Sequence, residues 1–345
     1  MASAAASSSF RRRGRALLSL LALVLLMSPA SARRSAASPS RSLMELYRPP
    51  PGDMLRYHDG AVLSGDVPVS VLWYGRFTPA QKAVVSDFLL SLSPAPQGPP
   101  APAPSVAQWW GSINRLYLSK AAPVGKNGAR GGAAAGNARV VLAGQVSDEA
   151  CSLGKSLKLS QLPALAAAAR PAQAGGIALV LTARDVAVEG FCASRCGHHG
   201  SYGGGGAGSS TRAAYAWVGN PADQCPGQCA WPFHQPAYGP QAPPLVPPNG
   251  DAGMDGAVIS VAGMVAGAVT NPFGDGFYQG DRGAPLEAAT ACAGVYGSGA
   301  YPGYAGRLLV DAATGASYNA HGARGREYLL PALYDPGTGE CATLV

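Results

Sequence analysis

The chain has 345 residues and a formal net charge of +7, with 13% charged and 47% hydrophobic residues. Residues 1–32 hold four arginines and no acidic residue, so the rest of the chain carries a charge of only about +3. This balance excludes the strongly basic signature of a nucleic-acid-binding protein, and the hydrophobic content is ample for one core. The 46 glycines and 30 prolines predict a loop-rich surface.

The N-terminus predicts a secretory signal peptide over residues 1–32. Four arginines at positions 11–15 precede an apolar run from Ala16 to Met27, and Ala30-Ser31-Ala32 supplies the small residues of a cleavage site. A membrane anchor is disfavoured, because a span requires about 20 apolar residues. We therefore expect a protein outside the cell.

The remaining chain is expected to form one domain. Residues 33–54 are rich in Ser, Arg and Pro, which indicates a disordered lead-in or a removable pro-segment. Folding is predicted to begin near Leu55, and residues 55–345 show no repeat and no convincing boundary.

Strands alternate with helices in the first half of this domain. Val67 to Tyr74, Arg139 to Leu142 and Ile177 to Leu181 are predicted strands. Helices are predicted from the Thr78-Pro79 cap to about Leu92, from Ser105 to Leu118 and from Ser160 to about Ala169. The pattern predicts an α+β fold, a mixed sheet with helices packed on it. Trp109 and Trp110 are interpreted as core residues, with sugar stacking as the alternative.

Chemistry concentrates between Phe191 and Phe233, with His234 directly after. The segment contains Cys192, Cys196, His198, His199, the glycine run Gly203 to Gly206, an apolar strand from Ala213 to Val218, Cys225, Cys229 and Trp231. Thiolates beside histidines are ligands that zinc prefers. The same cysteines are also suited to anchoring an irregular, glycine-rich loop through disulfides, and an oxidising compartment favours this second interpretation.

Six of the seven cysteines are accordingly predicted to form disulfides, in a pairing that the sequence leaves open. They are Cys192, Cys196, Cys225, Cys229, Cys292 and Cys341. Cys341 is expected to tie the C-terminal tail to the domain. Cys151 lies apart from the others and is the candidate free thiol, most simply a small buried hydrophobe.

An almost wholly apolar helix is predicted from Gly256 to Val269, capped by Asp255. Because apolar residues surround it on all sides, the helix should be fully buried. Gly263 and Gly267 would let another element approach it closely. At about fourteen residues it is too short to cross a bilayer.

Most catalytic signatures can be checked in the sequence, and those fail. No histidine is followed by glutamate, so there is no H-E-x-x-H zinc helix, and no serine lies in a G-x-S-x-G elbow. Gly154-Lys155-Ser156 lacks the first glycine of a phosphate loop, because position 149 is Glu149. Paired carboxylates for glycoside cleavage stay open, although nothing singles out such a pair.

Several segments have a specific sequence: Tyr57-His58-Asp59-Gly60, Val71-Leu72-Trp73-Tyr74-Gly75, Phe191-Cys192 to Cys196-Gly197, Gln224 to Gln235, and Tyr301-Pro302-Gly303-Tyr304-Ala305-Gly306. They resemble the Exordium family of plants, also called phosphate-induced proteins. The similarity covers about Leu55 to Val345. It implies a secreted apoplastic or cell-wall protein associated with brassinosteroid-responsive growth and cell expansion. The family offers no established biochemical activity to transfer to these residues.

A fainter resemblance concerns the apolar helix. Ala268-Val269-Thr270-Asn271-Pro272 and Gly276-Phe277-Tyr278 are similar to the segment after the metal helix of certain secreted zincin-like proteins. On that pattern Gly263, Met264 and Gly267 occupy the positions of the ligands and the catalytic glutamate, and none of them binds zinc or moves a proton. The hypothesis is a degenerate peptidase-like scaffold that works by binding, and it requires a sheet packed on this helix.

We therefore expect a non-enzymatic protein without a metal or cofactor, which binds a cell-wall polysaccharide or another apoplastic protein. The candidate binding-surface residues are His198, His199, Trp231 and His234. No nucleic acid is expected as a partner, and no membrane after signal cleavage. The alternative is a wall-modifying hydrolase or metal-dependent enzyme whose active site the sequence does not reveal. Ligand identity and oligomeric state stay open.

Overall fold

The computed structural model describes residues 54–94, 101–121, 136–169, 175–193, 195–203 and 212–345. The predicted signal peptide and lead-in, and most of the Gly203 to Gly206 run, lie outside these residues.

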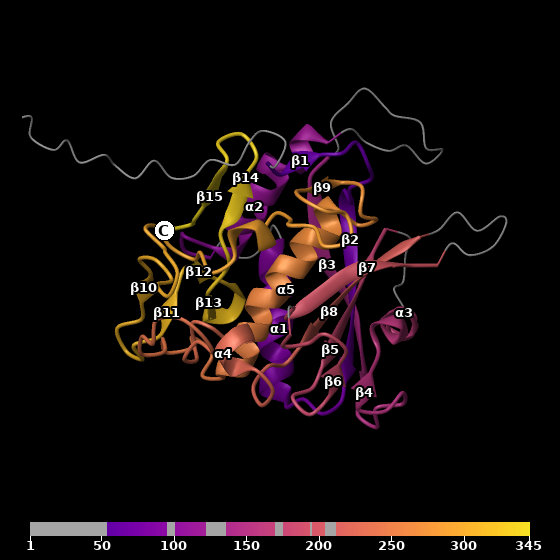
Figure 1. Ribbon diagram of the computed structural model, residues 1–345, viewed down its shortest axis with the longest axis horizontal. Helices are drawn as coiled ribbons and strands as arrows, with labels where there is room; N and C mark the ends of the chain where they lie inside the picture. The colour runs from indigo at the N-terminus through magenta and orange to yellow at the C-terminus, as the bar shows by residue number, and fades with distance from the viewer. Residues whose placement is uncertain (1–53, 95–100, 122–135, 170–174, 194, 204–211) are drawn as a thin grey trace, which may run out of the picture. The chain divides into compact units, whose positions relative to one another are not determined.

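The described fold is built on a five-stranded mixed sheet in the order β3-β2-β5-β8-β7 (Figure 1). The four parallel strands are β2 (Gly65–Tyr74), β3 (Ala138–Asp148), β5 (Ile177–Thr182) and β8 (Ala213–Gly219). β7 (Gly197–Tyr202) runs antiparallel to β8 at one edge. The α+β class and the mixed sheet predicted from the sequence are confirmed.

The central strands are buried along their length, as expected for parallel strands covered on both faces. Every residue of β5 is buried, and so are the last eight of β2. The strand predicted from Arg139 to Leu142, which is β3, is longer in the structure than expected. The strand continues six residues beyond Leu142 because it pairs with β2 across a bulge, and that second half is a mostly exposed edge without the apolar pattern of a core strand.

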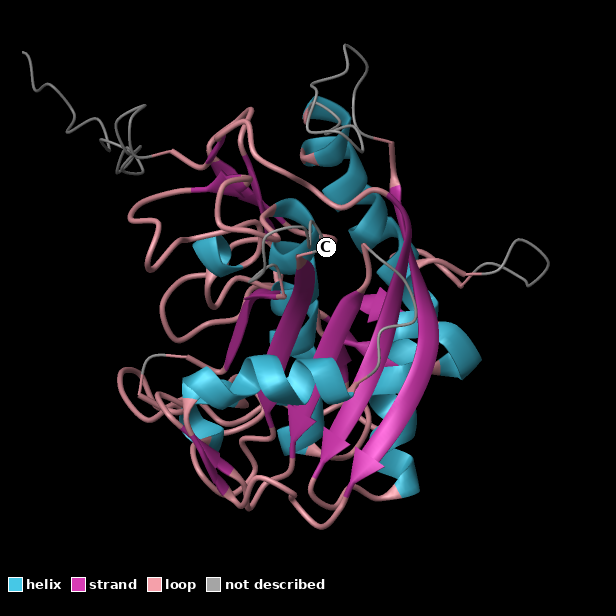
Figure 2. Cartoon of the chain, turned by 90° about the vertical axis from the view of Figure 1, so that its right-hand side faces the viewer, coloured by secondary structure: helices cyan, strands magenta, loops and turns pink. Residues whose placement is uncertain are grey.

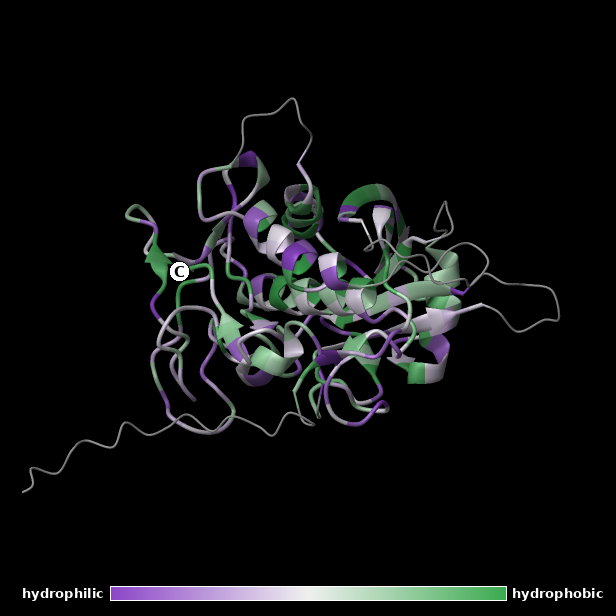
Figure 3. Cartoon of the chain, turned by 90° about the horizontal axis from the view of Figure 1, so that it is seen from above, coloured by the Kyte–Doolittle hydropathy of each residue, from purple (hydrophilic) through white to green (hydrophobic). Residues whose placement is uncertain are grey.

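Helices cover both faces of this sheet (Figure 2). α1 (Pro79–Leu92) and α5 (Ala252–Thr270) lie on one face and contact each other, whereas α3 (Leu162–Ala168) packs on β5 from the other. α2 (Val106–Leu116) packs on α1, and the short α4 (Pro226–Cys229) packs on α5. Figure 3 shows hydrophobic and hydrophilic residues on the same helix in places, as expected where one side of a helix faces the core.

The start of α1 and that of α2 follow capping rules that the sequence displays. Thr78 accepts a hydrogen bond from Gln81 N, and Ser105 accepts one from Gln108 N, each within a complete capping box. Trp109 and Trp110 of α2 are each only 2% exposed. Their interpretation as core residues is confirmed, and the sugar-stacking alternative is wrong.

The apolar helix α5 begins earlier than predicted. Its N-cap is Asp251, whose side chain accepts a hydrogen bond from Met254 N, whereas Asp255 lies buried in the first turn. With 19 residues the helix is long and apolar enough to cross a membrane, so the expectation that it is too short was wrong. However, 83% of its most apolar window is buried inside the fold, which identifies α5 as a core helix.

Short two-stranded ladders make up the other sheets in the described residues. They are β1 (Arg56–Tyr57) with β9 (Phe277–Tyr278), β4 (Ser156–Leu157) with β6 (Ala187–Val188), β10 (Leu309–Val310) with β11 (Ser317–Tyr318), β12 (Ala320–His321) with β13 (Glu327–Tyr328), and β14 (Leu333–Asp335) with β15 (Glu340–Ala342). Short 3-10 turns cover Leu118–Lys120, Leu159–Gln161, Thr290–Cys292 and Ala323–Gly325. The C-terminal third is therefore held by its loops and by packing rather than by long strands.

Candidate functional site

Two parallel disulfides fix the segment that leads into β7. Cys192 pairs with Cys225 and Cys196 with Cys229, so this segment is joined to the residues of α4. Because these sulfurs are bonded to each other, the zinc interpretation of the four cysteines is wrong. Cys292 pairs with Cys341 near the C-terminus, and Cys151 is the free cysteine, buried in the core.

The segment after Cys196 is not the irregular loop that its glycines suggested. Residues from Gly197 to Tyr202 pair one for one with β8, so the apolar strand provides a template that overrides the weak strand preference of glycine. The histidines of this segment therefore lie on an edge strand.

A cleft of about 820 Å³ opens between β7, α5 and the segment 271–296. Its volume lies within the range of about 300–1,000 Å³ that is usual for ligand sites. Three of the candidate residues, His198, His199 and Trp231, line it. Among the described residues, no group of three or more His, Cys, Asp or Glu is placed to hold a metal ion.

A buried histidine and glutamate meet at this cleft. His199 Nε2 lies 2.6 Å from Glu287 Oε2, and their side chains are 10% and 5% exposed. The other carboxylate oxygen, Oε1, accepts a hydrogen bond of 2.7 Å from Asn271 Nδ2, and Asn271 Oδ1 in turn accepts one from Gly276 N. The glutamate is therefore held from both sides in one orientation, with its own N–H bonded to Thr290 Oγ1.

The second ring nitrogen of His199 is Nδ1. It accepts a hydrogen bond when the ring is neutral with its proton on Nε2, and donates one when the ring is charged. Nδ1 is buried and has no hydrogen-bond partner among the described residues. A buried polar atom without a partner costs about 1–3 kcal/mol, and the contacts of the described residues do not offset this cost at Nδ1.

The glycine at position 267 of α5 makes room for the pair. A Cβ atom there would lie 2.7 Å from both Glu287 Oε2 and His199 Nε2, which is too close. The close approach expected at Gly267 is therefore present. At Gly263 it is not, because a Cβ atom would meet only Ala289, at an ordinary 3.8 Å.

His198 projects from the opposite face of β7, since successive side chains of a strand alternate. Its ring centroid lies 6.0 Å from that of Tyr215. Burial, helped by the neighbouring His199 and Arg195, lowers the pKa of His198 to about 4. The residue is therefore neutral above that pH, and the two adjacent histidines have different environments.

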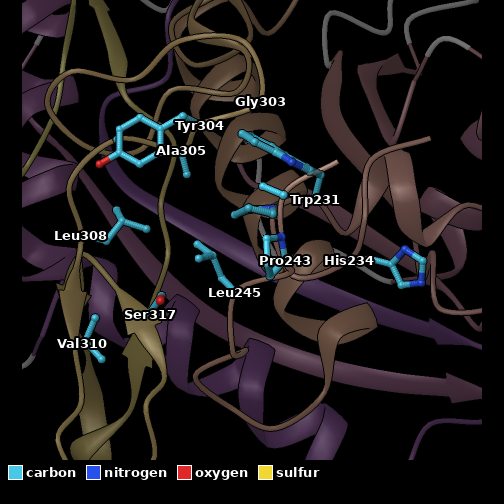
Figure 4. A pocket seen from close by; sticks show the side chains of 13 residues that line it. Trp231, His234, Pro243, Leu245, Gly303, Tyr304, Ala305, Leu308, Val310 and Ser317 are labelled. Atoms are coloured by element: carbon cyan, nitrogen blue, oxygen red, sulfur yellow. The ribbon is translucent and has the colours of Figure 1, made fainter. Parts of the chain in front are cut away.

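Trp231 and His234 line a second, smaller pocket of about 230 Å³. Figure 4 shows Trp231 near Gly303 and Tyr304, whereas the ring of His234 points away from the other labelled side chains. His234 is exposed, with Nδ1 3.0 Å from the carbonyl oxygen of Gln235. The four candidate residues thus belong to two sites, and Trp231 lines both.

Sequence reasoning missed Glu287 and the role of Asn271. Glu287 is separated by 88 positions from His199, and its neighbours in the sequence carry no catalytic or metal-binding motif. Asn271 stood out in the sequence only as part of the segment Ala268 to Pro272 that follows the apolar helix. The one signal was Gly267, because a glycine inside a buried helix indicates that something approaches it closely.

Comparison with known proteins identifies the family. A family model described as "Phosphate-induced protein 1 conserved region" matches residues 55–344. Protein PHOSPHATE-INDUCED 1 of Nicotiana tabacum is 53% identical over 89% of this chain and 93% of its own length, and Protein EXORDIUM of Arabidopsis thaliana is 53% identical over 85% and 90%. No solved structure matches the chain. Since the match spans nearly all of the described residues, the chain belongs to the Exordium or phosphate-induced protein family.

Proposed function

We propose that the protein is secreted to the plant cell wall and supports brassinosteroid-responsive growth by binding a ligand in the cleft between β7 and α5. Membership of the Exordium family supports the link to growth. Three disulfides are compatible with an oxidising, extracellular compartment. Wall polysaccharides and other extracellular proteins are the ligands that this location offers.

The observation that carries the proposal is the fixed polar pair at the cleft. Both oxygens of Glu287 are engaged, one by His199 and one by Asn271. A carboxylate held in this way is preorganised to orient His199 toward a ligand, which reduces the entropy lost on binding. With both oxygens engaged and the side chain only 5% exposed, the carboxylate serves His199 and Asn271 rather than a substrate, and this favours binding over catalysis.

The test uses the full secreted chain and the variant Glu287→Gln, which keeps the shape of the side chain. Solubilised wall polysaccharide and a mixture of extracellular peptides are passed over each immobilised protein. We expect the wild type to retain a component chemically unchanged, and the variant to retain at least several-fold less. Asp223→Asn, which alters an exposed ion pair outside the cleft lining, is the matched control. Equal retention by all three proteins would contradict the proposal.

The second candidate function is hydrolysis, and the same contact favours it. A histidine oriented by a carboxylate is the arrangement that enzymes use for a general base. In this case the retained component would be cleaved, and product release would fall by about 10²-fold or more in Glu287→Gln. If the wild type released product and Glu287→Gln did not, the function would be catalysis rather than binding.

A further inference from the structure

We propose that the ligand of the cleft is an extended peptide that pairs with β7 as an additional strand. The inference rests on the proposed function, since it assigns a chemical class to the ligand of the same cleft. It follows from the hydrogen bonds of β7, from the course of the cleft and from its charge.

The outer side of β7 offers unpaired backbone groups. Gly219 N–H donates to the carbonyl oxygen of Cys196, and in an antiparallel ladder this fixes the alternation along the strand. His198, Gly200 and Tyr202 bond to β8, so the N–H and C=O groups of the intervening Gly197, His199 and Ser201 point away from the sheet. Among the described residues, these three make no backbone hydrogen bond beyond the ladder.

The cleft follows this edge. Every residue from Arg195 to Ser201 lines it, although the side chains of β7 alternate between the two faces of the sheet. Lining by residues of both faces means that the backbone edge itself borders the cleft. An extended peptide in the cleft would therefore meet a row of donors and acceptors with matching spacing.

The opposite edge of the same sheet is protected against such pairing. β3 is bulged opposite Val69 and Ser70, and its side chains are occupied by polar contacts, Arg139 with Asp66 and Ser147 with Lys82. Bulges and charged side chains are the usual protection of an edge strand. β7 has no bulge and no Lys, Arg, Asp or Glu, so this edge is left competent to pair.

The charge of the cleft selects an acidic peptide. Arg195 and Arg282 line it, and neither forms an ion pair within the described part of the chain. Among the described residues that line the cleft, Glu287 is the one acidic residue, and it is bound by His199 and Asn271. A neutral polysaccharide would use neither the free arginines nor the regularly spaced backbone groups.

The decisive variant is Ser201→Pro, with Ser201→Ala as its control. The N–H of Ser201 points outward, so proline removes a donor from the edge without removing a ladder bond. Both variants lose the hydroxyl that accepts a hydrogen bond from Arg212, so only the backbone donor distinguishes them. Equal secretion and equal thermal unfolding of the two variants establish that the fold is intact.

The probe is a displayed library of random dodecapeptides, selected on the wild-type protein. We expect enriched peptides to carry acidic residues, to bind Ser201→Ala as they bind the wild type, and to bind Ser201→Pro about tenfold more weakly. Binding should also slow hydrogen exchange at the amides of Gly197, His199 and Ser201. Arg282→Glu should weaken binding, whereas Arg115→Glu, on the exposed face of α2, should not.

Each other outcome overturns the inference. Failure to enrich any peptide, equal binding to both Ser201 variants, or unchanged exchange at the three amides would exclude strand pairing. Retention of wall polysaccharide in a Glu287-dependent manner, without peptide binding, would overturn the peptide and keep the proposed function. If the wild type neither bound a peptide nor retained polysaccharide, both the inference and the proposed function would be rejected.

Discussion

The two ends of helix α5 carry buried acidic clusters that differ in one respect. At the N-terminal end, Asp87 accepts hydrogen bonds from Arg324 and Arg326, and Arg326 also donates to Asn249. Asn249 in turn donates two hydrogen bonds to Asp255. Neither acidic residue lines either of the two pockets described above.

At the C-terminal end, the His199 and Glu287 pair lies beside Gly267 and lines the cleft. Here one buried atom, His199 Nδ1, has no partner among the described residues. The members of the first cluster bond to one another and line neither pocket, so they serve the fold, whereas the second cluster lines the cleft and borders any ligand bound there. The comparison predicts that changes at the first cluster alter stability and changes at the second alter binding.

The largest expected effect is that of Asp87→Ala. Asp87 is 2% exposed and serves two arginines, so its removal leaves Arg326, 26% exposed, without its buried counter-charge. Breaking a buried ion pair from one side costs about 3–5 kcal/mol, and we expect the lower end because Arg324 is 69% exposed and rehydrates. Denaturant unfolding measures the loss.

Asp66→Ala is the matched control, since it removes an acidic residue from an exposed pair with Arg139. We expect no measurable change in its unfolding midpoint. A similar loss of stability in both variants would show that the cluster around Asp87 stabilises the fold no more than an exposed ion pair does. The contrast between the two ends of α5 would then disappear.

The next effect separates two glycines of one helix. Gly267→Ala places a Cβ atom against His199 and Glu287, which costs about 1–3 kcal/mol and disturbs the cleft. Gly263→Ala has room, and the better helix propensity of alanine should stabilise the protein by up to about 1 kcal/mol. Denaturant unfolding should therefore show a lower stability for Gly267→Ala and a higher one for Gly263→Ala. A gain in stability for both variants would mean that His199 and Glu287 move aside for the added methyl group.

The same region shows how far the sequence predicts the molecule. Strands β2, β5 and β8 were predictable because buried parallel strands consist of consecutive apolar residues, and the start of α1 because its cap is local. β7 was not, because a strand containing two glycines and two histidines forms only beside a partner. The cap was predicted one turn late, at Asp255, because two aspartates four residues apart both precede the apolar run and the structure uses the first, Asp251.

The candidate site was predictable only in part, for a similar reason. The histidines and Trp231 stand out in the sequence by their density around the cysteines. Glu287 belongs to the site only because the chain returns to α5 after the turn at Asn271, and no local pattern records that return. Contacts made across 88 positions depend on the fold, so the partner of His199 became visible only with the structure.

The smallest expected effect is the net pH dependence of the wild type, because two buried groups on different elements, Asp255 of α5 and His198 of β7, oppose each other. Burial raises the pKa of Asp255 to about 7, so the folded state holds a proton that the unfolded state releases near pH 4, and stability falls as pH rises from about 4 to 7. Burial lowers the pKa of His198 to about 4, so the unfolded state binds the extra proton, and stability rises from about pH 4 to 6.5.

The two slopes oppose each other, each at most about 1.4 kcal/mol per pH unit, so the wild type should vary little over this range. In His198→Gln, the free energy of unfolding should fall from pH 4 to 7, because only the effect of Asp255 remains. In Asp255→Asn it should rise over the same range, because only the effect of His198 remains. Glu327, whose pKa is also raised by burial, is present in all three proteins and cancels in the differences. Parallel profiles in the two variants would contradict the assignment of opposite burial effects to these two residues.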